Sequence, residues 1–227
     1  MIINGVKDPM KRLKLLIIGL AIGLAGCNPM NNPSNIQGSG ITKTEKRAAA
    51  SFDSLDVNYA GSIEVRSQEQ ESLEISGDDN IIPVITTEVK NGTLYVRAIK
   101  GYSPRTKLQI RVSTPNVKRF VFEGVGEANL SNIKNDRLEI VVTGVGSFSA
   151  SGETKEVDIT LSGVGNVDAK NLRAVNAKVN SNAVGSVALY VTGQLDIKSS
   201  GIGEINYYGN PKIVNKQAEG IGKINQR

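Results

Sequence analysis

Apolar and polar residues alternate along most of the chain after residue 50, and this period of two predicts β-strands. No stretch after Ala50 has the 3.6-residue period of an amphipathic helix. Between residues 52 and 112 the alternating apolar positions are Leu55 and Val57, Ile63 and Val65, Leu73 and Ile75, Leu94 and Val96, and Leu108, Ile110 and Val112. We therefore expect an all-β protein.

Turn-forming residues separate these expected strands. Asn91-Gly92 lies between the alternating runs 86–90 and 93–97. Because both residues tolerate a positive φ, this pair predicts a β-hairpin with a two-residue turn. Ala60-Gly61 and the polar stretch 77–80 also have turn composition.

A Gly-Val-Gly phrase recurs through the second half of the chain. Its copies are 18 to 20 residues apart and begin at Gly124, Gly144, Gly163, Ala183, Gly201 and Gly220. Such a steady period is typical of stacked repeats. An apolar residue stands at the fifth position of every copy, and a second alternating run completes each unit, so we expect two short strands per unit. One unit cannot bury its own apolar face, but stacking covers it.

We therefore predict a β-solenoid, namely a right-handed parallel β-helix with rungs of about 19 residues over residues 113–227. The handedness follows from the strong preference for right-handed crossovers. Residues 41–112 are expected to form a more irregular β region. The third position of the phrase is glycine in all six copies, which predicts a positive φ there. Ala183 replaces the first glycine of one copy, so that position is expected to require close packing instead.

The N-terminus resembles the signal of a bacterial lipoprotein. The basic residues Lys11, Arg12 and Lys14 precede an apolar run of about 11 residues, 15–25, which is too short to span a bilayer. Leu24-Ala25-Gly26-Cys27 resembles a lipobox, in which the cysteine is lipidated and becomes the first mature residue. We expect residues 1–26 to be removed and Cys27, the only cysteine of the chain, to be lipidated. An ordinary signal peptide with a chance cysteine is the alternative.

Residues 27–40 are rich in Asn, Pro, Ser and Gly, so we expect them to form a flexible tether. Asn28, rather than an aspartate, follows the cysteine. By resemblance to lipoprotein sorting signals, this favours anchoring in the outer membrane. Whether the body would face the periplasm or the outside stays open.

Charge and composition exclude several classes of function. The net charge is +5, and residues 1–26 contribute +3 of it, so the remaining chain carries only about +2. We expect no nucleic-acid partner from this balance. The chain has no histidine, which removes the commonest general base and metal ligand. Aromatic residues make up 4% and tryptophan is missing, which disfavours the aromatic platforms of a sugar-processing cleft. We expect no catalytic residue and no cofactor.

One loop has the composition of a cation site. Asp78, Asp79 and Asn80 offer several oxygens for a hard cation such as calcium. Their spacing matches no EF-hand, and the composition is also that of an ordinary turn, so we assign no metal. A calcium-binding solenoid would need an aspartate in each repeat, and only Asp168 occupies the relevant column. The other residues of this sixth-position column could form a polar ladder on the outside, or a merely solvated face; they are Asn129, Ser149, Ala188, Asn206 and Asn225.

The Gly-Val-Gly phrase could also suggest a nucleotide-binding loop. It lacks the third glycine of a dinucleotide fingerprint, no helix follows it, and it occurs six times. We interpret it as a corner of the solenoid.

Several of these motifs together resemble the bacterial head GIN domain family, whose members are described as auto-transporter adhesins. The matching residues are Gly38-Ser39-Gly40, Arg47, Phe52, residues 55–57, residues 91–94, the Gly-x-Gly ladder, and the phrases 201–211 and 220–225. The resemblance covers roughly residues 38–225. It implies a secreted or lipid-anchored β-helical protein of Bacteroidetes-type bacteria, and it brings no catalytic residues.

Three functional hypotheses follow. The first is a non-catalytic, lipid-anchored envelope protein that acts as an adhesin or surface binding module with a glycan or protein ligand. The second is a β-helical enzyme acting on polysaccharides. The third is a structural envelope protein whose solenoid ends stack with partners or form a homo-oligomer, because the last rung has no evident capping helix.

Overall fold

The computed structural model describes residues 35–227. The predicted signal peptide, Cys27 and Asn28 lie outside the described residues. The described part is all-β apart from the short 3-10 helix η1 (Ile82–Val84). Its strands are β1 (Asn35–Gln37), β2 (Thr42–Lys46), β3 (Ser54–Asn58), β4 (Ala60–Ser67), β5 (Ser72–Asp78), β6 (Ile85–Lys90), β7 (Thr93–Ala98), β8 (Gly101–Ser103), β9 (Gln109–Thr114), β10 (Arg119–Phe122), β11 (Val125–Val142), β12 (Val145–Leu161), β13 (Val164–Ser181), β14 (Val184–Val191), β15 (Gln194–Ser199), β16 (Ile202–Tyr208), β17 (Ile213–Ala218) and β18 (Ile221–Gln226).

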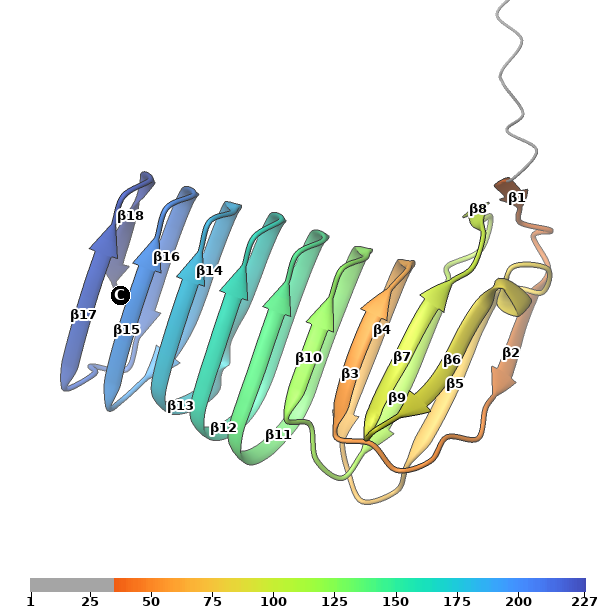
Figure 1. Ribbon diagram of the computed structural model, residues 1–227, viewed down its shortest axis with the longest axis horizontal. Coiled ribbons are helices and arrows are strands. Elements are labelled where there is room, and N and C mark those ends of the chain that lie inside the picture. The colour runs from red at the N-terminus through yellow and green to blue at the C-terminus, as the bar shows by residue number, and fades with distance from the viewer. Residues whose placement is uncertain (1–34) are drawn as a thin grey trace, which may run out of the picture. The chain divides into compact units, whose positions relative to one another are not determined.

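These strands stack in parallel as the rungs of a flattened β-solenoid, which confirms the predicted fold class (Figure 1). One face contains β7, β3, β10, the second halves of β11 to β13, β15 and β17. The other face contains β9, β4, the first halves of β11 to β13, β14, β16 and β18. The strands β11, β12 and β13 bend through the corner between the faces without a break, where two separate strands per unit were expected.

The winding is right-handed. In Figure 1 the chain rises along each front strand, passes over the upper edge and descends along the paler strand behind it, while it advances from β3 toward β18. This is the hand predicted from the crossover preference.

The solenoid begins earlier in the chain than residue 113, where the repeat analysis placed its start. β3 stacks in parallel on β10, and β4 stacks in parallel on β11. The register aligns Ala60 with Val125 and Gly61 with Gly126, so Ala60-Gly61 occupies the place of a Gly-Val-Gly corner. The periodic search missed this rung because the phrase is altered and because residues 68–118 are inserted before the next rung.

The inserted segment and the N-terminal strands close one end of the solenoid. β7 and β9 return as a further parallel rung, on which β6 and β5 pair in antiparallel fashion. The hairpin between β6 and β7 turns at Asn91 and Gly92, which have φ values of +50° and +74°. The hairpin predicted from the Asn-Gly pair is thereby confirmed. Antiparallel pairing in this region is also the irregularity expected for the first half.

The interior is one continuous apolar cluster that extends from Phe52 to Tyr207. Alternate residues of each strand point inward, as the period of two predicted, and the apolar column of one rung lies on that of the next. The last described rung departs from this pattern: Lys216 stands in register with Ile197, and Gln226 with Tyr207.

The two glycines of the repeated phrase serve different purposes. The third-position glycines of the first five copies have φ values between +136° and +155°, which only glycine adopts readily. The first-position glycine Gly163 has no such φ, but a Cβ atom on it would lie 1.8 Å from the carbonyl oxygen of Gly144. The predicted close packing is confirmed, and the predicted positive φ is confirmed in the first five copies; it is wrong for Gly222 in the sixth, where a Cβ atom would lie 1.8 Å from the carbonyl oxygen of Gly203.

The predicted flexible tether, residues 27–40, is wrong for its second part. Residues 35–37 form β1, which pairs with β8, and the segment that follows is bound by the loop after β5. Ser39 N donates to Asn80 Oδ1 at 2.9 Å, and Gly40 N donates to Asp78 Oδ1 at 2.7 Å. Composition alone could not predict this order, because the partners lie about 40 residues away in the sequence.

Candidate functional site

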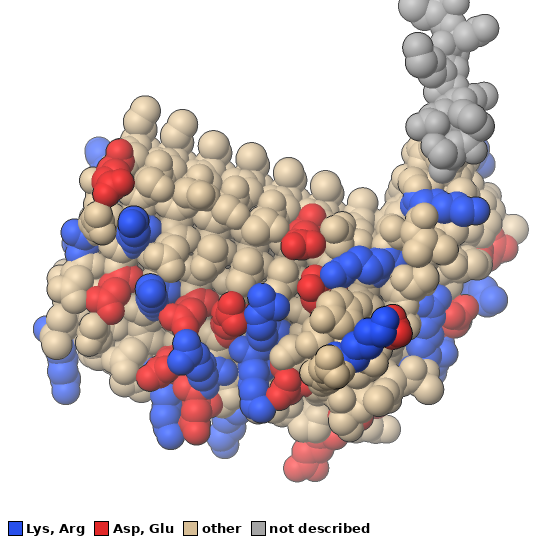
Figure 2. All heavy atoms as spheres, in the orientation of Figure 1, with Lys and Arg blue, Asp and Glu red and all other residues tan. Residues whose placement is uncertain are grey.

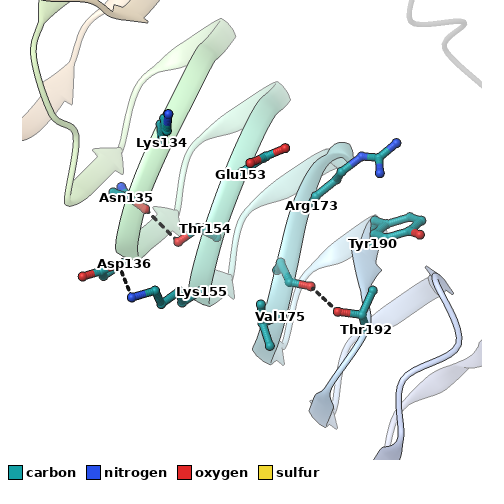
Figure 3. Close-up of a pocket in the computed structure, with 11 residues that line it drawn as sticks. Lys134, Asn135, Asp136, Glu153, Thr154, Lys155, Arg173, Val175, Tyr190 and Thr192 are labelled. Atoms are coloured by element: carbon teal, nitrogen blue, oxygen red, sulfur yellow. Dashed lines mark hydrogen bonds and ion pairs between the residues drawn. The ribbon is translucent and has the colours of Figure 1, made fainter.

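A groove of about 480 Å³ crosses the corners of four successive rungs (Figure 3). These corners join the two halves of each rung, at the edge opposite the Gly-Val-Gly corners. β11, β12, β13 and the end of β14 supply its lining: Lys134, Asn135, Asp136, Glu153, Thr154, Lys155, Arg173, Ala174, Val175, Tyr190 and Thr192. The groove therefore exists only because parallel stacking brings residues about 19 positions apart into one line.

A column of charged and aromatic side chains forms one wall of the groove. The strand register aligns Lys134 with Glu153, Glu153 with Arg173, and Arg173 with Tyr190. The Arg173 guanidinium carbon lies 5.6 Å from the centre of the Tyr190 ring, within the range of a cation–π contact. Figure 3 shows these side chains projecting from consecutive strands.

The neighbouring column is held in place by hydrogen bonds between rungs. Thr154 Oγ1 donates to Asn135 Oδ1 at 2.7 Å, and Asn135 Nδ2 donates to the carbonyl of Val117 at 2.6 Å. Thr154 is buried, although it is polar. These bonds fix the base of the groove, whereas the charged side chains above it are exposed.

The charges in the groove differ in whether they are already paired. Lys155 Nζ lies 2.8 Å from Asp136 Oδ1, and this hydrogen-bonded partner raises the pKa of Lys155 above its ordinary value. Lys134 and Arg173 form no ion pair within residues 35–227. Glu153, in register between them, forms no ion pair in the described residues either, so the groove offers two cationic groups, one carboxylate and one aromatic ring to a ligand.

The oxygen-rich loop that suggested a cation site is used for internal hydrogen bonds. Asp78 is fully buried, and its carboxylate accepts from the amides of Gly40, Arg105 and Thr106 at 2.7 to 3.0 Å. Burial alone would raise the pKa of Asp78, but these hydrogen bonds outweigh it and lower the pKa below the ordinary value. Asp79 Oδ1 accepts from Ser39 Oγ. Across residues 35–227, no group of three or more acidic or cysteine side chains is placed to hold a metal.

The outward polar column forms a ladder only in part. Asn129 Nδ2 donates to Ser149 Oγ at 2.6 Å, and Asn225 Nδ2 donates to Asn206 Oδ1 at 3.1 Å. Between these pairs, Asp168 instead forms an ion pair within its own rung, with its Oδ2 atom 3.2 Å from Lys170 Nζ. The column therefore reinforces the stack in places and leaves the rest solvated.

Sequence reasoning did not predict the groove. The one site residue that it did predict, Cys27, lies outside the described residues. The signal for the groove was available only at the level of the aligned repeat, since Lys134, Glu153, Arg173 and Tyr190 fall at corresponding corners. Irregular corner lengths obscured it, because the register shifts there between neighbouring rungs.

The geometry defines a repeat protein of the β-solenoid class with an open corner groove. A family model described as "Putative auto-transporter adhesin, head GIN domain" matches residues 51–211. The chain belongs to this head GIN domain family, as the motifs predicted. Membership of an adhesin-like family indicates a cell-surface or envelope protein.

Solved structures similar to this chain come from Bacteroides and Parabacteroides species. The chain is 27% identical to a putative adhesin from Bacteroides fragilis, with a TM-score of 0.72 over 85% of this chain and 100% of the other. A putative adhesin from Parabacteroides distasonis is 17% identical, with a TM-score of 0.48 over 85% and 100% of the two chains. A putative lipid binding protein from the same species is 20% identical, with a TM-score of 0.45 over 84% and 99%. A comparison with curated proteins finds no match.

The described residues contain no helix of the length and apolarity that crossing a bilayer requires.

Proposed function

We propose that this protein is a non-catalytic envelope module, anchored in the outer membrane by lipid on Cys27, that binds an acidic glycan in the corner groove. The family supports an adhesin-like role, and the lipobox-like residues 24–27 support the anchor. The glycan follows from the chemistry of the groove.

The observation that carries the proposal is the column of Lys134, Arg173 and Tyr190 in an open groove. The guanidinium of Arg173 can donate two parallel hydrogen bonds to a carboxylate, and Lys134 adds a second positive charge. Arg173 lies over one face of the Tyr190 ring, and the opposite face would provide a flat apolar surface for a sugar ring. Asn135 and Thr192 add polar groups of the kind that bind sugar hydroxyls.

Binding is tested with carboxylated and neutral oligosaccharides of the same length. We expect the carboxylated series to bind, and we expect Arg173→Gln to weaken that binding at least about tenfold, equivalent to ~1.4 kcal/mol. Arg137→Gln is the matched control, because Arg137 is exposed on the adjacent face and pairs with Asp158. Equal effects of the two substitutions, or equal binding of neutral sugars, would refute the groove as an acidic-glycan site.

The lipid anchor is tested separately. Cells that express the full-length chain should incorporate labelled fatty acid into it, and Cys27→Ser should abolish this label. If the wild-type chain takes up no label, the lipid anchor is excluded and the N-terminus is an ordinary signal peptide.

The polysaccharide-active enzyme is examined with the same oligosaccharides. We expect no new reducing or unsaturated ends after prolonged incubation. The appearance of new reducing or unsaturated ends would show that the protein is an enzyme rather than a binding module.

A further inference from the structure

The middle residue of every Gly-Val-Gly copy is a large apolar side chain that points into solvent. The six side chains are between 49% and 75% exposed: Val125, Val145, Val164, Val184, Ile202 and Ile221. Strand register places each of them directly on the next, so they form one continuous line. With a rung spacing of about 4.8 Å, this apolar ridge is about 24 Å long.

An apolar residue is not required by the corner itself. The two glycines supply the unusual backbone, and a polar side chain would satisfy an exposed corner equally well. A contiguous apolar surface of this kind on a monomer is typically a contact site.

The surroundings of the ridge are uncharged in its middle and carry charges toward both ends, where Glu123, Glu127, Glu204, Glu219 and Lys223 flank the other three copies. In the three copies that begin at residues 144, 163 and 183, the residues directly before and after the phrase are Thr, Ser or Asn. Figure 2 shows the corresponding upper edge as a row of uncharged side chains, whereas Lys, Arg, Asp and Glu gather toward the lower part of the molecule. The middle of this edge therefore fits an apolar partner better than a charged one.

The chain enters the solenoid body at this same edge. Ile36 in β1 is paired with Tyr102 in β8. The hydroxyl of Tyr102 donates to the carbonyl of Ala60 at 2.7 Å, and Ala60 is in register with Val125, the first residue of the ridge. Figure 1 shows β1 and β8 at the upper edge. Cys27 precedes Asn35 by eight residues, which span at most about 28 Å when fully extended.

A second copy of the chain is a poor occupant for the ridge. A specific protein interface uses roughly 20 to 30 residues a side. The ridge offers a single file of six. A bilayer surface needs no such complementary area, because a lipid on Cys27 would already hold the ridge close to it.

We propose that the apolar ridge rests on the lipid bilayer to which the chain is anchored. The ridge orients the solenoid so that its opposite edge, with the groove, faces away from the membrane. The ridge contributes apolar contact at the headgroup boundary, and the anchor contributes most of the affinity. This inference rests on the lipid anchor proposed above and does not depend on the ligand of the groove.

The chain has no tryptophan, so single substitutions can report the depth of each position. The chain from Cys27 to Arg227 is coupled through its only cysteine to a maleimide lipid, which makes the experiment independent of cellular lipidation. The vesicles are phosphatidylcholine with bromine on the acyl chains. We expect V164W and I202W to show a blue-shifted emission that the brominated lipid quenches by about half, as for a ring at the acyl boundary.

The matched control is I213W. Ile213 is 53% exposed and Ile202 is 52% exposed, but Ile213 begins β17 at the groove edge. We expect I213W to be unquenched. Equal quenching at the two edges, or none at residues 164 and 202, would overturn the proposal.

Two further outcomes would also overturn it. Val164→Ser could lower the melting temperature while V164W stays unquenched, which would assign the ridge to packing between rungs. A concentration-dependent blue shift of V164W without vesicles would assign it to a second copy. In either case the glycan titrations, which need no lipid, would still decide the proposed function of the groove.

Discussion

A Cβ atom on Gly146 would lie 1.8 Å from the carbonyl oxygen of Gly126 in the preceding rung. Gly146 also has a φ of +145°, a backbone conformation that L-residues avoid. We therefore expect Gly146→Ala to lower the free energy of unfolding by about 2–5 kcal/mol, since backbone strain and overpacking both oppose it. Urea denaturation measures the change. Ser147→Ala, at the exposed neighbouring position, should stay within about 0.5 kcal/mol of the unsubstituted chain. A similar loss in both variants would contradict the assignment.

Asp78 is expected to make stability depend on pH in the acidic range. Its pKa is lowered in the folded state below the ordinary value of 3.8, so its stabilising contribution is complete above about pH 5. The contribution is lost as the pH falls through 3.8 toward the folded-state pKa. Asp78→Asn should therefore have a lower melting temperature than the unsubstituted chain at pH 7, and the difference should shrink at pH 3.

Asp79→Asn is the control for this titration, because within residues 35–227 the Asp79 side chain accepts one hydrogen bond, from Ser39 Oγ. Its melting temperature should follow that of the unsubstituted chain at both pH values more closely than that of Asp78→Asn. A constant difference for Asp78→Asn from pH 7 to pH 3 would show that the amide hydrogen bonds do not depend on the charge.

Arg47 connects β2 to the cap at the N-terminal end of the solenoid. Its guanidinium donates to the carbonyl oxygens of Ile85 at 2.5 Å and Ile82 at 3.2 Å, and its Nε donates to Glu45 at 2.7 Å. Arg47→Lys keeps the charge but loses the planar set of donors. We expect it to lower the free energy of unfolding by about 1.5–3 kcal/mol, the value of hydrogen bonds to a charged group. Lys46→Ala, at the exposed last residue of β2, should have little effect; a loss as large as that of Arg47→Lys would disprove the role of the guanidinium.

The solenoid was predictable because its repeat depends on local features that every rung must satisfy. Each rung needs glycine where the φ is positive and where backbones approach closely, so the phrase recurs wherever the corner recurs. The rung made by β3 and β4 was missed because its corner lacks the Gly-Val-Gly phrase. Tyr59 and Ala60 stand where later copies have Gly124 and Val125, and the backbone stacks in register all the same. The corner is therefore preserved in the strand register, although its residue types no longer match the repeated phrase.

The groove and the docked N-terminal segment could not be predicted, because both depend on contacts between distant residues. Arg173 and Tyr190 are separated by 17 positions and come together through a register shift at the corner. The sequence around Ser39 has the composition of a linker, and only the folded structure shows that the amide of Ser39 donates to Asn80 Oδ1. The apolar middle residue of each Gly-Val-Gly copy can be read from the sequence, but the alternation of apolar and polar residues does not show which side chains at a corner face solvent.

Phe148 joins the two faces of the solenoid and provides the most direct test of the shared core. Its ring centre lies 5.5 Å from that of Phe120, which comes from β10 on the opposite face, and both side chains are almost completely buried. Phe148→Ala should lower the free energy of unfolding by about 3–5 kcal/mol. The substitution leaves a cavity between the two faces of the solenoid, and neither face can move inward on its own to fill it. Phe148→Leu should cost less than the alanine variant, since more of the volume is kept. If the solenoid is one cooperative unit, the dependence of stability on urea concentration stays unchanged in both variants, and a change in that slope would instead reveal that the stack separates into parts at this rung.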